Sequence, residues 1–140
     1  QGGTFTQSGA TLTMAGSANA LSMRNTTISG ALIISGGGAV VFDATNNGTA
    51  TLSSTATLSL TGSTPTFNIA NGAASTDMLV SGIISSSGAG ITKTGAGTLQ
   101  FSGTAANTYS GLTTVSNGTL LLSKTAGINA ISGNILINGG

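Results

Sequence analysis

The sequence predicts an all-β fold, specifically a single-stranded parallel β-helix, or β-solenoid, of about six or seven turns. Three observations predict it. Short runs of alternating apolar residues recur along the chain, separated by Gly, Asn and Ser. An apolar column and a turn signal both return after about 20 to 24 residues. No window shows the period of an amphipathic helix. We expect residues 1–140 to form a single solenoid domain or segment.

The expected strands are runs in which β-branched or bulky apolar residues alternate with small polar ones. In chain order they are Ala10–Met14, Thr26–Ile34, Ala39–Phe42, Thr55–Leu60, Thr66–Ile69, Met78–Ile84, Thr98–Phe101, Leu112–Val115, Thr119–Leu122 and Asn134–Ile137. Gly and Asn between them tolerate the left-handed backbone of tight turns. We interpret the glycines at 88–90, 95–97 and 36–38 as such turns, not phosphate loops, because no helix follows them.

The interval between apolar residues favours a solenoid over an antiparallel sandwich with Asn-Gly hairpins, which is the alternative fold. The expected column contains Leu12, Ile33, Leu58, Leu79, Leu99 and Leu120. Asn-Gly pairs keep a similar interval at Asn47, Asn71, Asn117 and Asn138. Alternate side chains of each strand point inward. We therefore expect a core that includes Leu12, Met14, Ile33, Leu58, Leu60, Leu99, Phe101, Leu120 and Leu122.

Charge is scarce, with three basic and two acidic side chains in the whole sequence. This leaves no basic stripe for nucleic acid and no acidic cage for a cation. No apolar run approaches the roughly 18 residues of a membrane span, so we expect no membrane insertion by this segment. The absence of cysteine excludes disulfides and thiolate metal ligands. The start, Gln1-Gly2-Gly3, lacks the basic and apolar regions of a signal peptide.

Catalytic residues are not predicted, because the chain contains neither His nor Glu and its two acids are far apart in sequence. Asp43 and Asp77 are 34 residues apart, and we interpret each as a turn residue or a paired surface charge. Arg24 and Asp43 are about one turn apart and are expected to form an exposed pair. The sequence assigns no catalytic, cofactor-binding or metal-binding residue, and no cofactor.

One stretch carries a specific motif. It reads K-T-G-A-G-T-L from Lys93, then N-T-Y-S-G from Asn107, then T-T-V-S-N-G-T-L from Thr113. The stretch 93–122 resembles the autotransporter-associated β-strand repeat of secreted bacterial passenger regions. The resemblance implies a right-handed solenoid without catalytic activity, located outside the cell or on its surface. It implies a structural segment of a fibre or passenger that supports adhesion or biofilm. Asn107 and Tyr109 are expected to pack and cap a corner.

Both ends of the expected stack lack a charged, helical or proline-rich cap. We expect either flanking repeats of a longer chain or a head-to-tail homopolymer as the partner. The alternative function is ice binding through Thr-x-Thr rows, such as Thr11-x-Thr13, Thr49-x-Thr51, Thr55-x-Thr57 and Thr64-x-Thr66. With so few ionisable groups, stability is expected to be almost independent of pH between about 5 and 9.

Overall fold

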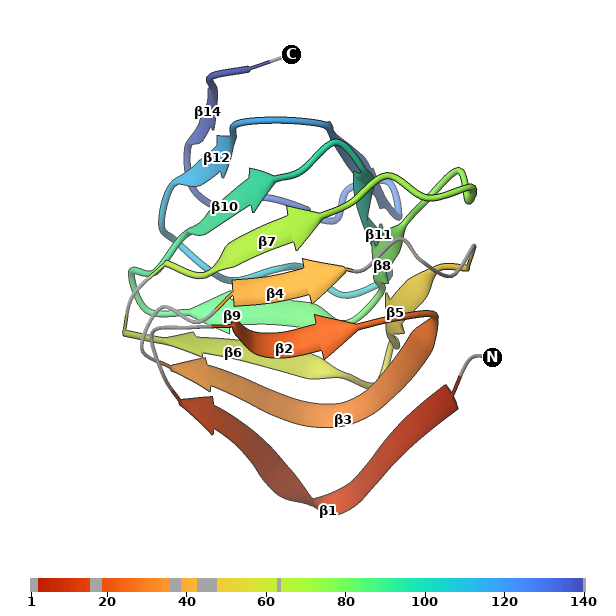
Figure 1. The fold of residues 1–140 in the computed structure, drawn as a ribbon. Helices are drawn as coiled ribbons and strands as arrows, with labels where there is room; N and C mark the ends of the chain where they lie inside the picture. The colour runs from red at the N-terminus through yellow and green to blue at the C-terminus, as the bar shows by residue number, and fades with distance from the viewer. Residues whose placement is uncertain (1–2, 16–18, 36–38, 43–47, 63, 140) are drawn as a thin grey trace.

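A computed structural model describes residues 3–15, 19–35, 39–42, 48–62 and 64–139. Within these ranges the secondary structure consists of fourteen β-strands. Figure 1 shows them piled in layers, from β1 at the bottom to β14 at the top. No helix in the described part of the chain is long and apolar enough to cross a membrane.

The strands are short, apart from two near the N-terminus. Their bounds are β1 Gly3–Ala15, β2 Asn19–Met23, β3 Thr26–Ser35, β4 Ala39–Phe42, β5 Ala50–Leu52, β6 Thr57–Thr61, β7 Thr66–Ile69, β8 Met78–Val80, β9 Ile83–Ser86, β10 Ile91–Thr94, β11 Thr98–Gly103, β12 Thr113–Val115, β13 Thr119–Lys124 and β14 Ile135–Ile137. The strands expected at 39–42 and 66–69 have the predicted bounds. The run expected at 78–84 is instead divided into β8 and β9.

The chain forms a parallel β-solenoid, which confirms the predicted fold class. One sheet has the order β13-β11-β8-β5-β3-β6-β9, with β1 beside β3, and the other has β14-β12-β10-β7-β4-β2. Every pairing is parallel. The first half of β3 pairs with β5 and its second half with β6, so one bent strand serves two faces of the coil.

The stack contains about five turns, compared with the six or seven that the repeat length predicts. The handedness implied by the resemblance stays a prediction. Three strands, β2, β5 and β10, are absent from the expected set. Strand β10 reads Ile-Thr-Lys-Thr, and its lysine occupies one of the inward positions, so the apolar alternation breaks there. Strand β2 contains no β-branched or aromatic residue and β5 contains one, Thr51, so the composition typical of strands is missing from both.

The core consists of the inward residues of successive layers. The expected core residues Leu58, Leu60, Leu99 and Phe101 are buried, Leu120 is half-buried, and Leu122 is 47% exposed. The expected core residues Leu12 and Met14 are among those whose side chains the structure does not describe. Other buried apolar side chains include Met23, Ile28, Leu32, Val40, Leu52, Phe67, Ile69, Met78, Val80, Ile84 and Ile91.

The predicted column of inward apolar residues was wrong at two positions. Ile33 is in register with Ser59, while its neighbour Leu32 is in register with Leu58 and is buried. Leu79 is in register with Gln100 and is half-buried, because Met78 occupies the inward position opposite Leu99. Leucines occur on both sides of a strand, and a shift of one residue moves a side chain to the other face.

The turns depend on glycine where layers approach closely. Gly95 and Gly118 have φ of 73° and 71°, as expected for left-handed turns. A Cβ atom at Gly118 would lie 2.4 Å from the carbonyl oxygen of Gly95 in the layer below. The turn prediction is also confirmed at Gly88, whose φ is 99°. It was wrong for Gly90 and Gly97, whose φ is not positive. Glycine suits these two positions because a Cβ atom would lie 2.0 Å from the carbonyl oxygen of Leu112 and 2.4 Å from that of Ala70. The glycines at 36–38 lie outside the described residues.

Candidate functional site

The described residues contain no group of three or more His, Cys, Asp or Glu that could hold a metal, and they form no pocket. The unusual feature is polar and lies inside the coil. Asp77, Lys93, Asn107 and Thr113 are each no more than 1% exposed. We treat these buried groups, together with the turns that they contact, as the candidate site.

Asp77 lies just before β8 and binds two backbone amides. Its Oδ1 accepts a hydrogen bond from the amide of Gly72 at 2.7 Å, and its Oδ2 accepts one from the amide of Thr98 at 2.8 Å. The first bond closes the turn within its own layer, and the second joins that layer to the next. The prediction of a turn residue is therefore confirmed for Asp77, but the prediction of a surface charge is wrong.

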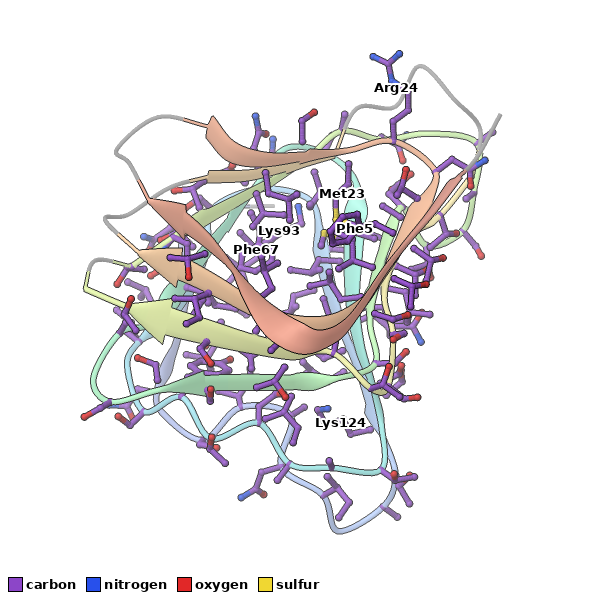
Figure 2. All side chains as sticks on the ribbon, turned by 90° about the horizontal axis from the view of Figure 1, so that it is seen from below. Phe5, Met23, Arg24, Phe67, Lys93 and Lys124 are labelled. Atoms are coloured by element: carbon purple, nitrogen blue, oxygen red, sulfur yellow. The ribbon has the colours of Figure 1, made fainter. Side chains whose placement is uncertain are left out.

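Lys93 occupies an inward position of β10, in register with Phe67 below and Val115 above. Figure 2 shows it among the labelled interior side chains, in contrast to Arg24, which projects outward. Its Nζ donates to the carbonyl oxygens of Thr94 and Gly95, both at 2.7 Å, and to that of Asn117 at 3.1 Å. An ammonium group has three protons, so all of them are bound.

Burial lowers the pKa of Lys93 to about 8, although the charge of Asp77 acts in the opposite direction. The expectation that stability is almost independent of pH between about 5 and 9 is therefore wrong for the alkaline part of that range. Sequence reasoning recognised this lysine only as a motif residue. The available signal was its alternation with Ile91 in the Ile-Thr-Lys-Thr strand, which places both side chains on the same face.

Asn107 also binds backbone groups of neighbouring layers, at another corner of the coil and through a neutral side chain. Its Oδ1 accepts from the amide of Ile84 at 2.9 Å, and its Nδ2 donates to the carbonyl oxygen of Ala130 at 2.8 Å. It therefore joins the layer below to the layer above. We call Asp77 and Lys93 with their turns the charged corner, and Asn107 with its partners the neutral corner.

Tyr109 packs beside the neutral corner and is completely buried. Its hydroxyl lies 2.8 Å from Oγ1 of Thr113 in a buried hydrogen bond. Burial raises the pKa of Tyr109 above its ordinary value. The expected packing and capping role of Asn107 and Tyr109 is confirmed.

The other charged groups lie nearer the surface. Lys124 is half-buried, and its Nζ donates to the carbonyl oxygen of Ser102 at 2.8 Å and to that of Gly82 at 3.2 Å. Desolvation lowers its pKa. Arg24 is exposed. Asp43, its expected partner, lies outside the described residues.

The expected Thr-x-Thr rows do not stack on one another. Thr57 is in register with Ala31 and Ile83. Thr51 is in register with Thr27, which pairs with Thr4, but its partner on the other side is Leu79, so these threonines cover only three layers. A threonine column does occur on the second sheet, where Thr92 lies between Thr66 and Thr114. Its next position is Leu136, so the column covers three layers. A serine column runs beside the first sheet, with hydrogen bonds between Ser29 and Ser53 and between Ser81 and Ser102.

Comparison with known families gives one match, in which the passenger-associated-transport-repeat corresponds to residues 91–122. No curated protein and no solved structure matches the chain. The matched segment contains three of the four buried polar residues, Lys93, Asn107 and Thr113, and it also contains Tyr109. Residues 91–122 are thus similar to a passenger-associated transport repeat, carried here as part of a parallel β-solenoid.

Proposed function

We propose that this chain is a structural, non-catalytic segment of a bacterial surface or extracellular passenger. The repeat at 91–122 and the solenoid fold both support a passenger segment. The observation that carries the structural role is the use of the buried polar groups. Among the described residues, no buried side-chain nitrogen or oxygen lacks a hydrogen-bond partner.

The same observation argues against catalysis at the charged corner. Both carboxylate oxygens of Asp77 and all three protons of Lys93 are engaged with backbone groups. A general acid or base must instead reach a proton of the substrate. We expect only background rates against polysaccharide, ester and peptide substrates. Turnover that disappears in Asp77→Asn but survives in Arg24→Gln would overturn this part of the proposal.

The outermost layers support stacking on further layers. Phe5 is 45% exposed, whereas its register partner Ile28 is 6% exposed. At the other end Ile137 is 68% exposed, and its partner Val115 is 5% exposed. Another coil placed on either end would bury these side chains and pair the free strand edges. The covering coil would belong to flanking repeats or to a second copy, which would extend the stack into a fibre that supports adhesion or biofilm.

Sedimentation and electron microscopy of the purified chain test self-stacking. The wild type should form rods that lengthen with concentration. Ile137→Lys should shorten them, because it brings a charge into the stacked interface, whereas Thr114→Lys on the side of the coil should not. A wild-type chain that stays monomeric at high concentration would contradict the homopolymer and leave flanking repeats as the covering coil. Thermal hysteresis in the same samples would instead favour ice binding.

A further inference from the structure

Two Asn-Gly pairs of the described chain lie in contrasting surroundings. At Asn117-Gly118, the amide nitrogen of Gly118 donates to Oδ1 of Asn117 itself at 2.8 Å. At Asn71-Gly72, the amide of Gly72 donates to the buried carboxylate of Asp77 at 2.7 Å. Both asparagines are exposed, so water reaches both. The two pairs share their chemistry and differ in what holds the glycine nitrogen.

The hydrogen bond at Asn117 has a geometric consequence. It closes a small ring through the glycine nitrogen, the backbone carbon, Cα, Cβ, Cγ and Oδ1 of the asparagine. The glycine nitrogen is therefore held beside Cγ, the carbon that it must attack to form a five-membered succinimide. Holding two reacting groups together removes much of the entropic barrier to their reaction.

Lys93 supplies the second element. Its Nζ donates to the backbone carbonyl oxygen of Asn117, and this carbonyl belongs to the peptide bond whose nitrogen is that of Gly118. When the nitrogen loses its proton, negative charge spreads onto that oxygen. An ammonium group hydrogen-bonded to the oxygen stabilises the charge as it develops. At Gly72 the opposite holds, because a carboxylate beside the N–H disfavours its ionisation.

We propose that Asn117 is a self-modification site, at which the fold promotes succinimide formation and deamidation. The nitrogen of Gly118 forms a bond to Cγ of Asn117, the bond between Cγ and Nδ2 breaks, and ammonia leaves with the proton of Gly118. Water then opens the succinimide at either carbonyl, giving aspartate or isoaspartate. The reaction needs no oxidant, reductant or cofactor.

The product alters the repeat from within. Either form adds a carboxylate next to the turn that Lys93 holds. Isoaspartate also lengthens the backbone by one carbon, close to the hydrogen bond from the amide of Thr119 to the carbonyl oxygen of Gly97. The isoaspartate product would weaken stacking between the layers at this turn, and its accumulation would mark the age of a long-lived segment.

Peptide mass spectrometry of the full chain, incubated at pH 7.4 and 37 °C, tests the proposal. Asn117 should gain the mass of deamidation about tenfold faster than Asn71. The reason is that the ammonium of Lys93 favours ionisation of the Gly118 nitrogen, whereas the carboxylate of Asp77 disfavours ionisation of the Gly72 nitrogen. In denaturant the two rates should converge to within about threefold, since the local sequences are similar and the fold is lost.

Lys93→Met should slow the reaction at Asn117 by about tenfold, whereas Lys124→Met serves as the matched control and should not. Slow reaction at Asn71 in each variant reports that the fold is intact. The wild-type comparison between folded and denatured chain needs no variant. Equal rates at Asn117 and Asn71 in the folded chain, or a faster reaction at Asn117 in denaturant than in the fold, would overturn the proposal.

Discussion

The charged corner and the neutral corner both fix the spacing between layers. At the neutral corner, the amide side chain of Asn107 bonds to Ile84 below and Ala130 above. At the charged corner, Asp77 binds two backbone amides and Lys93 binds three backbone carbonyls. An amide carries its donor and acceptor on one neutral group, whereas the charged corner divides them between two ions.

The two corners differ in the free energy that is needed to bury their polar groups. Moving an ion out of water carries a penalty that a neutral amide avoids, and this penalty changes with pH when the ion titrates. The pKa of Lys93, about 8, lies within an accessible range. The charged corner should therefore make stability depend on pH, and the neutral corner should not.

The largest expected effect is that of Asp77→Ala. It leaves the half-buried amides of Gly72 and Thr98 without their acceptor. Each orphaned donor costs about 1–3 kcal/mol, so the free energy of unfolding should fall by about 2–6 kcal/mol. Denaturant titration measures this loss. A loss below about 1 kcal/mol would show that water replaces the carboxylate and that the corner is open.

Asn107→Ala should have a similar but smaller effect, about 1–4 kcal/mol, because it orphans one donor and one acceptor in the neutral corner. The loss should be the same at pH 6 and pH 9. Thr108→Ala, at the exposed neighbouring position, is the matched control. If the loss varied strongly with pH, an ionisable group would have to act at this corner, contrary to the contacts described.

The pH dependence of the wild type should be modest and positive in alkaline solution. The folded pKa of Lys93 is about 8, and the ordinary value is 10.5. Between these values the unfolded chain binds more protons, so the free energy of unfolding rises with pH. From pH 7.5 to 9.5 we expect a gain of about 1–2 kcal/mol, which Lys93→Met should remove.

Lys124 and Tyr109 also contribute to the dependence of stability on pH. Burial also lowers the pKa of Lys124, so Lys124→Met shows its share of the gain. Burial raises the pKa of Tyr109, so that the folded chain holds this proton more tightly and stability falls above about pH 10. A wild-type stability that is flat or falls between pH 7.5 and 9.5 would contradict the assignment to Lys93.

The sequence predicts the fold better than it predicts the site. Alternation and the recurring interval indicate a parallel coil because each layer must bury the same face. The same interval cannot set the register, since one turn takes 26 residues from Leu32 to Leu58 and another takes 21 from Met78 to Leu99. A mean interval therefore places Ile33 and Leu79 one residue away from the buried positions.

The burial of Asp77 and Lys93 was not predicted, for a different reason. A lone lysine or aspartate is usually solvated, and nothing local distinguishes one whose partners lie a full turn away in sequence. Lys93 reaches Asn117 and Asp77 reaches Thr98 only once the layers are stacked. Asn107 was easier to interpret, because the repeat motif includes it and a neutral capping role suits its residue type.

Cysteine cross-linking tests the central claim, the parallel register between layers, most directly. The chain has no cysteine of its own, and Thr92 and Thr114 are register partners on β10 and β12. Parallel neighbours lie about 4.8 Å apart, within the range that a disulfide spans, whereas Thr92 and Ser116 would be about 8 Å apart. Mild oxidation should therefore join Cys substitutions at 92 and 114 rapidly, and those at 92 and 116 hardly at all. Equal cross-linking of the two pairs, or none at 92 and 114, would contradict the stacked parallel coil.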